Sequence, residues 1–210
     1  MSNQSQISCM LIRGGTSKGA YFLGDDLPDD VQERDEVLLR VMGSGDISQI
    51  NGIGGGTTLT SKVAIVSKSH DPDVDLEYLF AQVGVEERVV DTKPSCGNIL
   101  SGILAFASEN QLVPLESPTT TLRVKNTNTN TIIEVSGETP QGQVQYQGSM
   151  KIDGVPGTGS PVMLNFLDVG GSKTGSLFPT GKSPISSTAW KSHASMLPFL
   201  CCILPLNPLV

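Results

Sequence analysis

The segment 96–109 is apolar on nearly every face of the helix that its sequence predicts. Its apolar positions are Ile99, Leu100, Ile103, Leu104, Phe106 and Ala107. A helix that is apolar all round belongs in a protein interior, where other elements cover it on every side. The chain therefore has to fold around this helix, which we expect at the centre of the structure.

Short strands are predicted on both sides of this segment. Those before it are residues 7–13, 20–23, 62–67 and 76–85, and those after it are 122–125, 131–135, 144–146 and 162–166. The first two flank a polar turn, 14–19, which predicts a β-hairpin. The whole pattern indicates an α/β (α+β) lobe in which a curved sheet wraps around the central helix.

A second helix is predicted over residues 31–42. Asp29 or Asp30 can cap its first turn, and a Gly-Ser-Gly run at 43–45 ends it. Its partly apolar face consists of Val31, Val37, Leu38 and Val41.

The charge of the chain limits its partners. The 210 residues suffice for one large or two small domains, and they carry a net charge of -7. Proteins that bind nucleic acid or anionic membranes need a clustered excess of Lys and Arg, which this sequence lacks. We therefore expect no nucleic-acid partner and no membrane partner. The first apolar run, 7–12, is too short for the core of a signal peptide, so we expect a cytoplasmic location.

The cysteines and histidines suggest no metal chemistry. No metal-ligand spacing joins the four cysteines, Cys9, Cys96, Cys201 and Cys202. The last two are adjacent and would form a strained bridge, so we expect reduced thiols, no disulfide and no bound metal. His70 falls in a surface turn and His193 in the last segment, which does not support a Ser-His-Asp hydrolase.

Residues 182–210 follow neither a strand period nor a helical one. Their apolar run, 196–206, is broken by Pro198 and Pro205 and is shorter than a bilayer-spanning helix. Exposed, it would promote aggregation or bind a partner, and a shifted reading frame or a truncated gene would produce such a segment. We expect an irregular tail here.

Two short stretches carry groups suited to proton transfer. One is a glycine-rich run that ends in Ser61 and Lys62, and the other is the predicted helix start, residues 95–98. Together they offer an amine, a thiol and backbone N–H donors for an anionic ligand. Proton transfer next to a carboxylate uses groups of this kind.

Both reactive groups also have ordinary explanations. Most lysines are solvated, and a lysine acts as a base only when its surroundings favour the neutral amine. Most buried cysteines serve as small apolar side chains. Cys96, however, is at a predicted helix start, where unpaired N–H groups and the helix dipole favour a thiolate. This position favours an acid–base or orienting role.

The tip of the predicted hairpin offers further groups for an anion. They are the guanidinium, backbone and hydroxyls of Arg13, Gly15, Thr16 and Ser17. A tight turn without a ligand is the alternative. Glycines 54–56 and the pair Gly97 and Asn98 either let the backbone approach the ligand or serve chain conformation alone. Residues 126–129 are either a polar strand end near the ligand or a turn.

Four motifs occur in a fixed order: MLIRGGTSKG at 10–19, INGIGGG at 50–56, LTSKVAI at 59–65 and CGN at 96–98. In this combination the chain resembles the methylaconitate isomerase and 4-oxalomesaconate tautomerase family, over about residues 7–181. Members of that family resemble diaminopimelate epimerase, with two similar halves and the active site between them. Each half is a curved, mostly antiparallel sheet around a central helix. The resemblance implies that residues 1–181 are the N-terminal lobe.

The resemblance also implies an isomerase. It would shift a double bond by a cofactor-independent 1,3-allylic proton transfer on a small unsaturated di- or tricarboxylate, such as 4-oxalomesaconate or methylaconitate. Lys62 and Cys96 match the family's proton carriers. The implied substrate-binding residues are Arg13, Gly15, Thr16, Ser17, Ser61, Gly97 and Asn98. No cofactor or metal is implied, and a homodimer is left open.

Two alternatives remain open. The first is a truncated, inactive half of such an enzyme. The second is an epimerase of the same fold, which would invert a carbon centre without moving a double bond. The two-cysteine form of an epimerase is disfavoured, because the next cysteine after Cys96 is Cys201 in the expected tail.

Overall fold

The computed structural model describes residues 6–167, 185–186 and 191–192. The chain divides into two units, Met1–Asn165 and Phe166–Val210, and each is described by itself. In the second unit, β9 (Ile185–Ser186) pairs antiparallel with β10 (Lys191–Ser192). The predictions for His193, for the last two cysteines and for the apolar run 196–206 lie outside the described residues.

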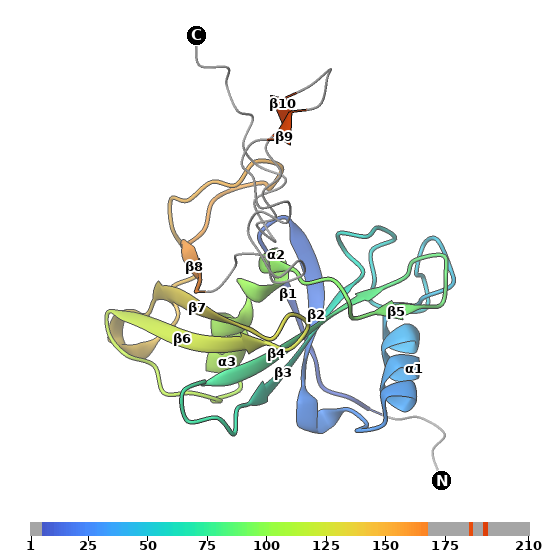
Figure 1. Cartoon of the computed structure of the whole chain (residues 1–210), viewed down its shortest axis with the longest axis horizontal. Coiled ribbons are helices and arrows are strands. Elements are labelled where there is room, and N and C mark those ends of the chain that lie inside the picture. Colours follow the sequence, from blue (N-terminus) through green and yellow to red (C-terminus); the bar gives the residue numbers. More distant parts are fainter. Residues whose placement is uncertain (1–5, 168–184, 187–190, 193–210) are drawn as a thin grey trace. The chain divides into compact units, whose positions relative to one another are not determined.

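One mixed sheet of eight strands organises the first unit (Figure 1). Its strands are β1 (Met10–Gly14), β2 (Ser17–Leu23), β3 (Lys62–Lys68), β4 (Leu76–Val83), β5 (Val90–Asp91), β6 (Thr119–Asn126), β7 (Thr131–Glu138) and β8 (Val162–Phe166). Their order is β1-β2-β3-β4-β6-β7-β8, and β5 pairs with β4. The pairs β2–β3 and β4–β6 are parallel, whereas β1–β2, β3–β4, β4–β5 and β6–β7 are antiparallel.

The helices are short. They are η1 (Gly24–Asp26), α1 (Val31–Met42), α2 (Gly97–Leu100), α3 (Ile103–Glu109) and η2 (Pro140–Gly142). Within the described residues, no helix combines the length and the apolar character needed to cross a membrane.

Helix α1 begins and ends where the sequence predicts. The carboxylate of Asp30 accepts hydrogen bonds from the backbone N–H groups of Gln32 and Glu33, at 2.9 and 3.0 Å. Gly43 follows the last turn with a φ of 73°, a left-handed conformation that glycine adopts without a steric penalty. The choice between Asp29 and Asp30 is thereby settled in favour of Asp30.

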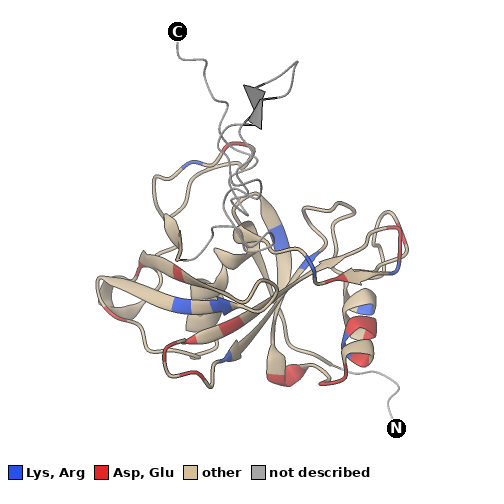
Figure 2. Cartoon of the chain, viewed as in Figure 1, with Lys and Arg blue, Asp and Glu red and all other residues tan. Residues whose placement is uncertain are grey.

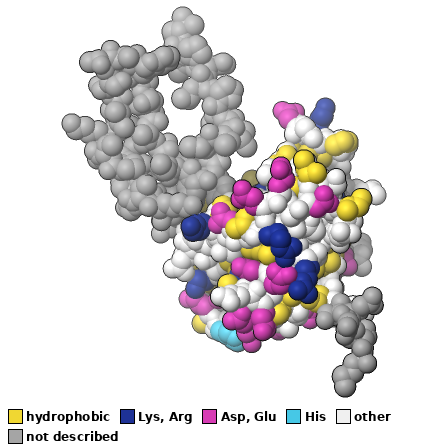
Figure 3. Space-filling view, turned by 90° about the vertical axis from the view of Figure 1, so that its right-hand side faces the viewer, with side chains coloured by type: hydrophobic (Ala, Val, Ile, Leu, Met, Phe, Trp, Pro, Cys, Tyr) yellow, Lys and Arg dark blue, Asp and Glu magenta, His cyan; other side chains and the backbone are white. Residues whose placement is uncertain are grey.

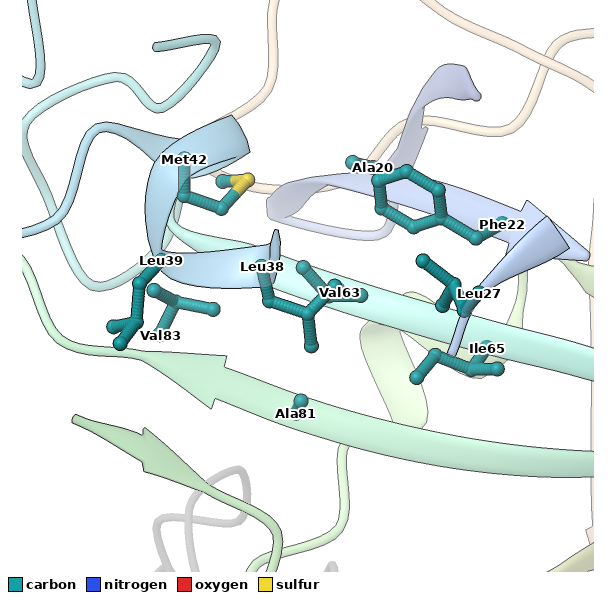
Figure 4. Close-up of a cluster of buried hydrophobic side chains, with 10 residues drawn as sticks. All are labelled: Ala20, Phe22, Leu27, Leu38, Leu39, Met42, Val63, Ile65, Ala81 and Val83. Atoms are coloured by element: carbon teal, nitrogen blue, oxygen red, sulfur yellow. The ribbon is translucent and has the colours of Figure 1, made fainter. Parts of the chain in front are cut away.

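One face of the sheet packs against α1 (Figure 4). Buried side chains of the strands on this face are Ala20, Phe22, Val63, Ile65, Ala81 and Val83. Leu38, Leu39 and Met42 of α1 pack on them, together with Leu27. We call this side the α1 face.

The opposite face of the sheet, which we call the inner face, packs against the central helices. Helix α2 contacts β1, β2 and β3, and α3 contacts β7. Because side chains alternate along a strand, Tyr21, Tyr78 and Phe80 point to this side. The ring of Tyr21 lies 5.8 Å from that of Phe106 in α3. The apolar residues predicted for the central helix are buried, which confirms its interior position.

The central helix differs from the prediction in being interrupted. Helix α2 ends at Leu100 and α3 begins at Ile103, with Gly102 between them. The hydroxyl of Tyr21 donates to the carbonyl of Ile99 and occupies the space that a Cβ on Gly102 would need. A tyrosine from β2 therefore sits at the break.

Two further expectations are corrected. The hairpin turn is shorter than 14–19, because the β1–β2 ladder continues to the pair Gly14–Ser17. The expected strand 144–146 is wrong. Its backbone is joined to the rest of the fold only by single bonds, from the Gln145 N–H to Glu138 and from the Ser160 N–H to Tyr146, and these form no ladder.

Candidate functional site

Lys62 is the first residue of β3 and lies on the inner face. Its register partners are Gly19 on β2 and Gln82 on β4. The Lys62 Nζ donates to Gln82 Oε1 at 2.7 Å and lies 5.0 Å from the centroid of the Phe80 ring. The amine is therefore held above the sheet by one amide oxygen and one aromatic face.

The glycine-rich loop before Lys62 is fixed by a buried glutamine. The Gln49 Nε2 donates to the hydroxyl of Ser61 at 2.8 Å, and its Oε1 accepts from the Gly56 N–H at 3.0 Å. Ser61 is completely buried. Its hydroxyl thus serves the loop, although the sequence suggests it as a ligand contact.

Cys96 caps the start of α2 and is a half-buried free thiol. Its carbonyl accepts from the Leu100 N–H at 3.0 Å and from the Tyr78 hydroxyl at 3.2 Å. Helix α2 itself has 4 residues, and Ser101 and Gly102 after it keep right-handed helical dihedral angles up to α3. The unpaired N–H groups of a first helical turn remain.

Two tyrosines of the inner face lie beside Cys96. Burial raises the pKa of the Tyr21 hydroxyl, and the negative charge of a Cys96 thiolate raises it further. The same two causes, in the same order, raise the pKa of Tyr78 well above its ordinary value. Both hydroxyls therefore stay protonated and donate to carbonyls of α2, which holds this short helix on the sheet.

The hairpin tip and the start of α2 form one assembly. The Asn98 Nδ2 donates to the Thr16 hydroxyl at 3.0 Å and to the Ser17 hydroxyl at 3.5 Å. Gly14 and Gly15 pack directly against Asn98 and leave no room there for a Cβ. Four sequence-predicted residues, Gly15, Thr16, Ser17 and Asn98, are thus brought together next to Gly97 and Cys96.

Arg13 touches this assembly at Gly15, but its side chain lies on the other side of β1. Ile12 and Gly14, its neighbours on β1, contact the central helices, so the Arg13 side chain points to the other side of the strand. Its Nη1 donates to the Gly15 carbonyl at 2.7 Å, and the side chain lines a hollow with the segment 150–160. No contact among the described residues joins it to Lys62 or Cys96.

Three amide side chains outside the predicted catalytic and substrate-binding residues also matter here. Gln82 contacts Lys62, and its signal was a polar residue between apolar ones on one face of a strand. Asn126 donates to the Ser95 hydroxyl at 2.6 Å. Asn128 exchanges hydrogen bonds with both backbone groups of Phe80, at 2.8 Å each. Residues 126–129 therefore support the segment that carries Cys96.

Lys62 on β3 and the segment 96–98 at the start of α2 thus lie on neighbouring elements and offer an amine and a thiol. An added Cβ on Gly19, the partner of Lys62, would lie 3.0 Å from Ile99 Cδ1, which shows how closely α2 approaches the start of β3. Such groups can move protons to and from a small anion. The described residues contain no cluster of His, Cys, Asp or Glu that could hold a metal.

Charged side chains of both signs are spread over the described part of the chain. Lys and Arg lie among Asp and Glu along the strands and helix α1 (Figure 2). Basic and acidic groups are likewise mixed on the face shown in Figure 3.

Comparison with known proteins gives a consistent answer. Residues 4–188 match the model of the PrpF protein family. The chain is 52% identical over 180 residues to 4-oxalomesaconate tautomerase of Pseudomonas putida, covering 86% of this chain and 50% of that protein. It is 44% identical over 181 residues to 3-methylitaconate isomerase of Eubacterium barkeri, covering 86% and 48%.

A solved structure shares the fold. The crystal structure of a methylitaconate-delta-isomerase matches with a TM-score of 0.85 and 41% identity, over 92% of this chain and 51% of that one. The predicted α+β lobe and the predicted family resemblance are confirmed. The chain spans about half the length of the relatives it matches.

Proposed function

Because the chain belongs to the PrpF protein family, whose relatives include named tautomerases and isomerases, we propose that it serves a 1,3-allylic proton shift. The substrate is a small unsaturated di- or tricarboxylate of the kind named in those relatives. We further propose that the reaction needs no cofactor and takes place in the cytoplasm. The N-terminal lobe, residues 1–181, supplies the groups that move the proton.

In this proposal Lys62 acts as the base. Its neutral amine takes a proton from the carbon next to the double bond, and the electron pair of that C–H bond moves into a dienolate. The double bond shifts by one position as the far carbon takes up a proton from the Cys96 thiol. One proton leaves the substrate and one enters it, so its composition is unchanged. Water then exchanges protons with both side chains.

The remaining candidates hold the carboxylates. The Asn98 side chain donates to the Thr16 hydroxyl, which sets the hairpin tip beside the first turn of α2 and its N–H groups on Gly97 and Asn98. Donors arranged in this way stabilise the negative charge that develops on a dienolate. The Arg13 side chain points away from these donors, so it would bind only a substrate that extends past the hairpin tip.

The position of Lys62 is the observation that carries the proposal. Its amine contacts a neutral amide and an aromatic ring, and it has no carboxylate partner among the described residues. A carboxylate in contact would keep the amine charged. The amide oxygen and the ring hold the amine in place on the inner face, where a bound substrate could meet it.

The test is turnover in heavy water. The protein is incubated with 4-oxalomesaconate or 3-methylitaconate, and double-bond migration and deuterium uptake are followed by ultraviolet absorbance and NMR. Lys62→Ala is expected to lower turnover by about 100-fold or more, since a positioned base contributes on the order of 10²–10⁴. Lys68→Ala, an exposed lysine at the other end of β3, is the matched control and should stay within about twofold of the parent.

The same assay separates the alternatives. Uptake of deuterium at one stereocentre without double-bond migration would indicate an epimerase. Turnover that appears only when the remaining part of the P. putida tautomerase is added would indicate a half that needs a second lobe. Full activity in Lys62→Ala, with or without the added second part, contradicts the proposed role of the amine.

A further inference from the structure

We propose that Gln82 is a positioning residue for Lys62: its side-chain oxygen fixes the direction in which the amine is presented to the substrate. This inference rests on the proposed function of Lys62 and adds a residue to which the sequence assigned no role. Gln82 lies directly opposite Lys62 in the β3–β4 ladder.

The orientation of the Gln82 amide is fixed by the backbone. Its Nε2 donates to the Ser61 carbonyl at 2.8 Å and to the Thr58 carbonyl at 3.2 Å. A rotated amide would bring its oxygen against these two carbonyl oxygens and its N–H groups against the lysine amine. It would lose three hydrogen bonds at once, so Oε1 is the atom that Lys62 meets.

This arrangement restricts the lysine amine to one place. Oε1 accepts one N–H of Lys62 at 2.7 Å, and the Phe80 ring lies beneath the amine at 5.0 Å. One N–H bond is thus directed at Gln82 in the charged and in the neutral form. The lone pair of the neutral amine must point away from the amide, which gives it a defined direction for proton abstraction.

Gln82 also links the amine to the loop before it. The carbonyls of Thr58 and Ser61 belong to the end of the glycine-rich loop, and the Ser61 hydroxyl is held in turn by Gln49. The loop, the amide and the amine therefore form one chain of hydrogen bonds. A displacement of the loop would reach Lys62 through Gln82.

Two substitutions separate the two contacts of Gln82: the hydrogen bond that its oxygen accepts from Lys62, and the hydrogen bonds that its amide donates to the loop. Gln82→Glu keeps an oxygen next to Lys62 but adds a negative charge and loses both donors. Gln82→Met has similar length and removes every hydrogen bond of the amide. Gln147→Glu, at an exposed position, controls for the added charge.

The first measurement does not depend on turnover. Lysine amines of the full chain are labelled by reductive methylation with ¹³C-formaldehyde, and the Lys62 signal is identified by its absence in Lys62→Arg. In Gln82→Glu the titration midpoint of this signal should move to higher pH by about 1 unit or more, as expected for a carboxylate in contact. Gln147→Glu should leave it in place. An unmoved midpoint in Gln82→Glu overturns the proposal.

The second measurement uses the isomerisation. Gln82→Met should lower kcat by on the order of 10- to 100-fold, the cost of a misdirected reacting group, with KM within about threefold. Gln82→Glu should move the rising limb of the pH–rate profile to higher pH. An increase in KM with an unchanged kcat, or a lower thermal stability with an unchanged kcat, would show a merely structural role and overturn the proposal. If Lys62→Ala keeps its activity while the Lys62 titration still responds to Gln82→Glu, the proposed function fails and the contact stands.

Discussion

The junction between the hairpin tip and the Cys96 helix can be tested at Gly15. Its φ of 53° is left-handed, and alanine in that conformation costs about 1–2 kcal/mol. A Cβ there would also lie 2.9 Å from Asn98 Cγ, and nearer still to the side-chain oxygen. Asn98 would have to turn away and lose its 3.0 Å bond to Thr16, worth about 0.5–1.5 kcal/mol. We expect Gly15→Ala to lower the free energy of unfolding by about 2–3 kcal/mol.

Gly157 provides the matched control. Its φ is 77°, and an added Cβ would meet no atom within 4 Å. Gly157→Ala therefore carries the backbone cost alone. Urea unfolding followed by circular dichroism should show Gly15→Ala to be less stable than Gly157→Ala by about 1 kcal/mol.

The cause of the difference can be isolated by a double-mutant cycle. Asn98→Ala removes the side chain that Gly15→Ala would strike, so the two losses should be less than additive. Equal losses in the two glycine variants, or strict additivity with Asn98→Ala, would refute the argument that Asn98 locks the tip to α2.

Two further predictions concern Cys96 and Glu36. Cys96→Ser should reduce turnover less than Lys62→Ala, because serine still donates a hydrogen bond at the helix start; turnover equal to that of Lys62→Ala would make the thiol indispensable. The hydrogen bond from Arg40, helped by Arg88, lowers the pKa of Glu36. Its contribution to stability is therefore present above the ordinary pKa of a glutamate and is lost as the pH falls through the lowered value. Unfolding of Glu36→Gln should differ from the parent near neutral pH and converge with it in acid, and a constant difference would contradict this.

Elements with local signals were predictable from the sequence. Helix α1 depends on a capping Asp30 and a left-handed Gly43, both adjacent to the helix, and its bounds agree with the expectation. The break in the central helix was not predictable, because Tyr21, which contacts the chain at the break, is distant in the sequence. Residues 144–146 alternate like a strand but lack a partner ladder, and pairing is a tertiary property.

The same distinction applies to the site. Motifs pointed to Lys62, Cys96 and the hairpin tip, and the structure places these on the inner face or beside it. Gln82 received no role from the sequence, since only the register of β3 and β4 sets it beside Lys62. Ser61 looked like a ligand contact, yet its hydroxyl is used by Gln49. Whether a polar side chain is already occupied depends on its neighbours in space, which a motif does not give.

We propose that Lys62 and Cys96 serve one bound anion. The alkylation rate of Cys96 with iodoacetamide, measured peptide by peptide with Cys9 as the exposed reference thiol, tests this. We expect 3-methylitaconate to slow alkylation of Cys96 but not of Cys9, and Lys62→Ala to weaken this protection. Alkylation of Cys96 that is unaffected by the acid, or protection that is equally strong without the lysine amine, would contradict it.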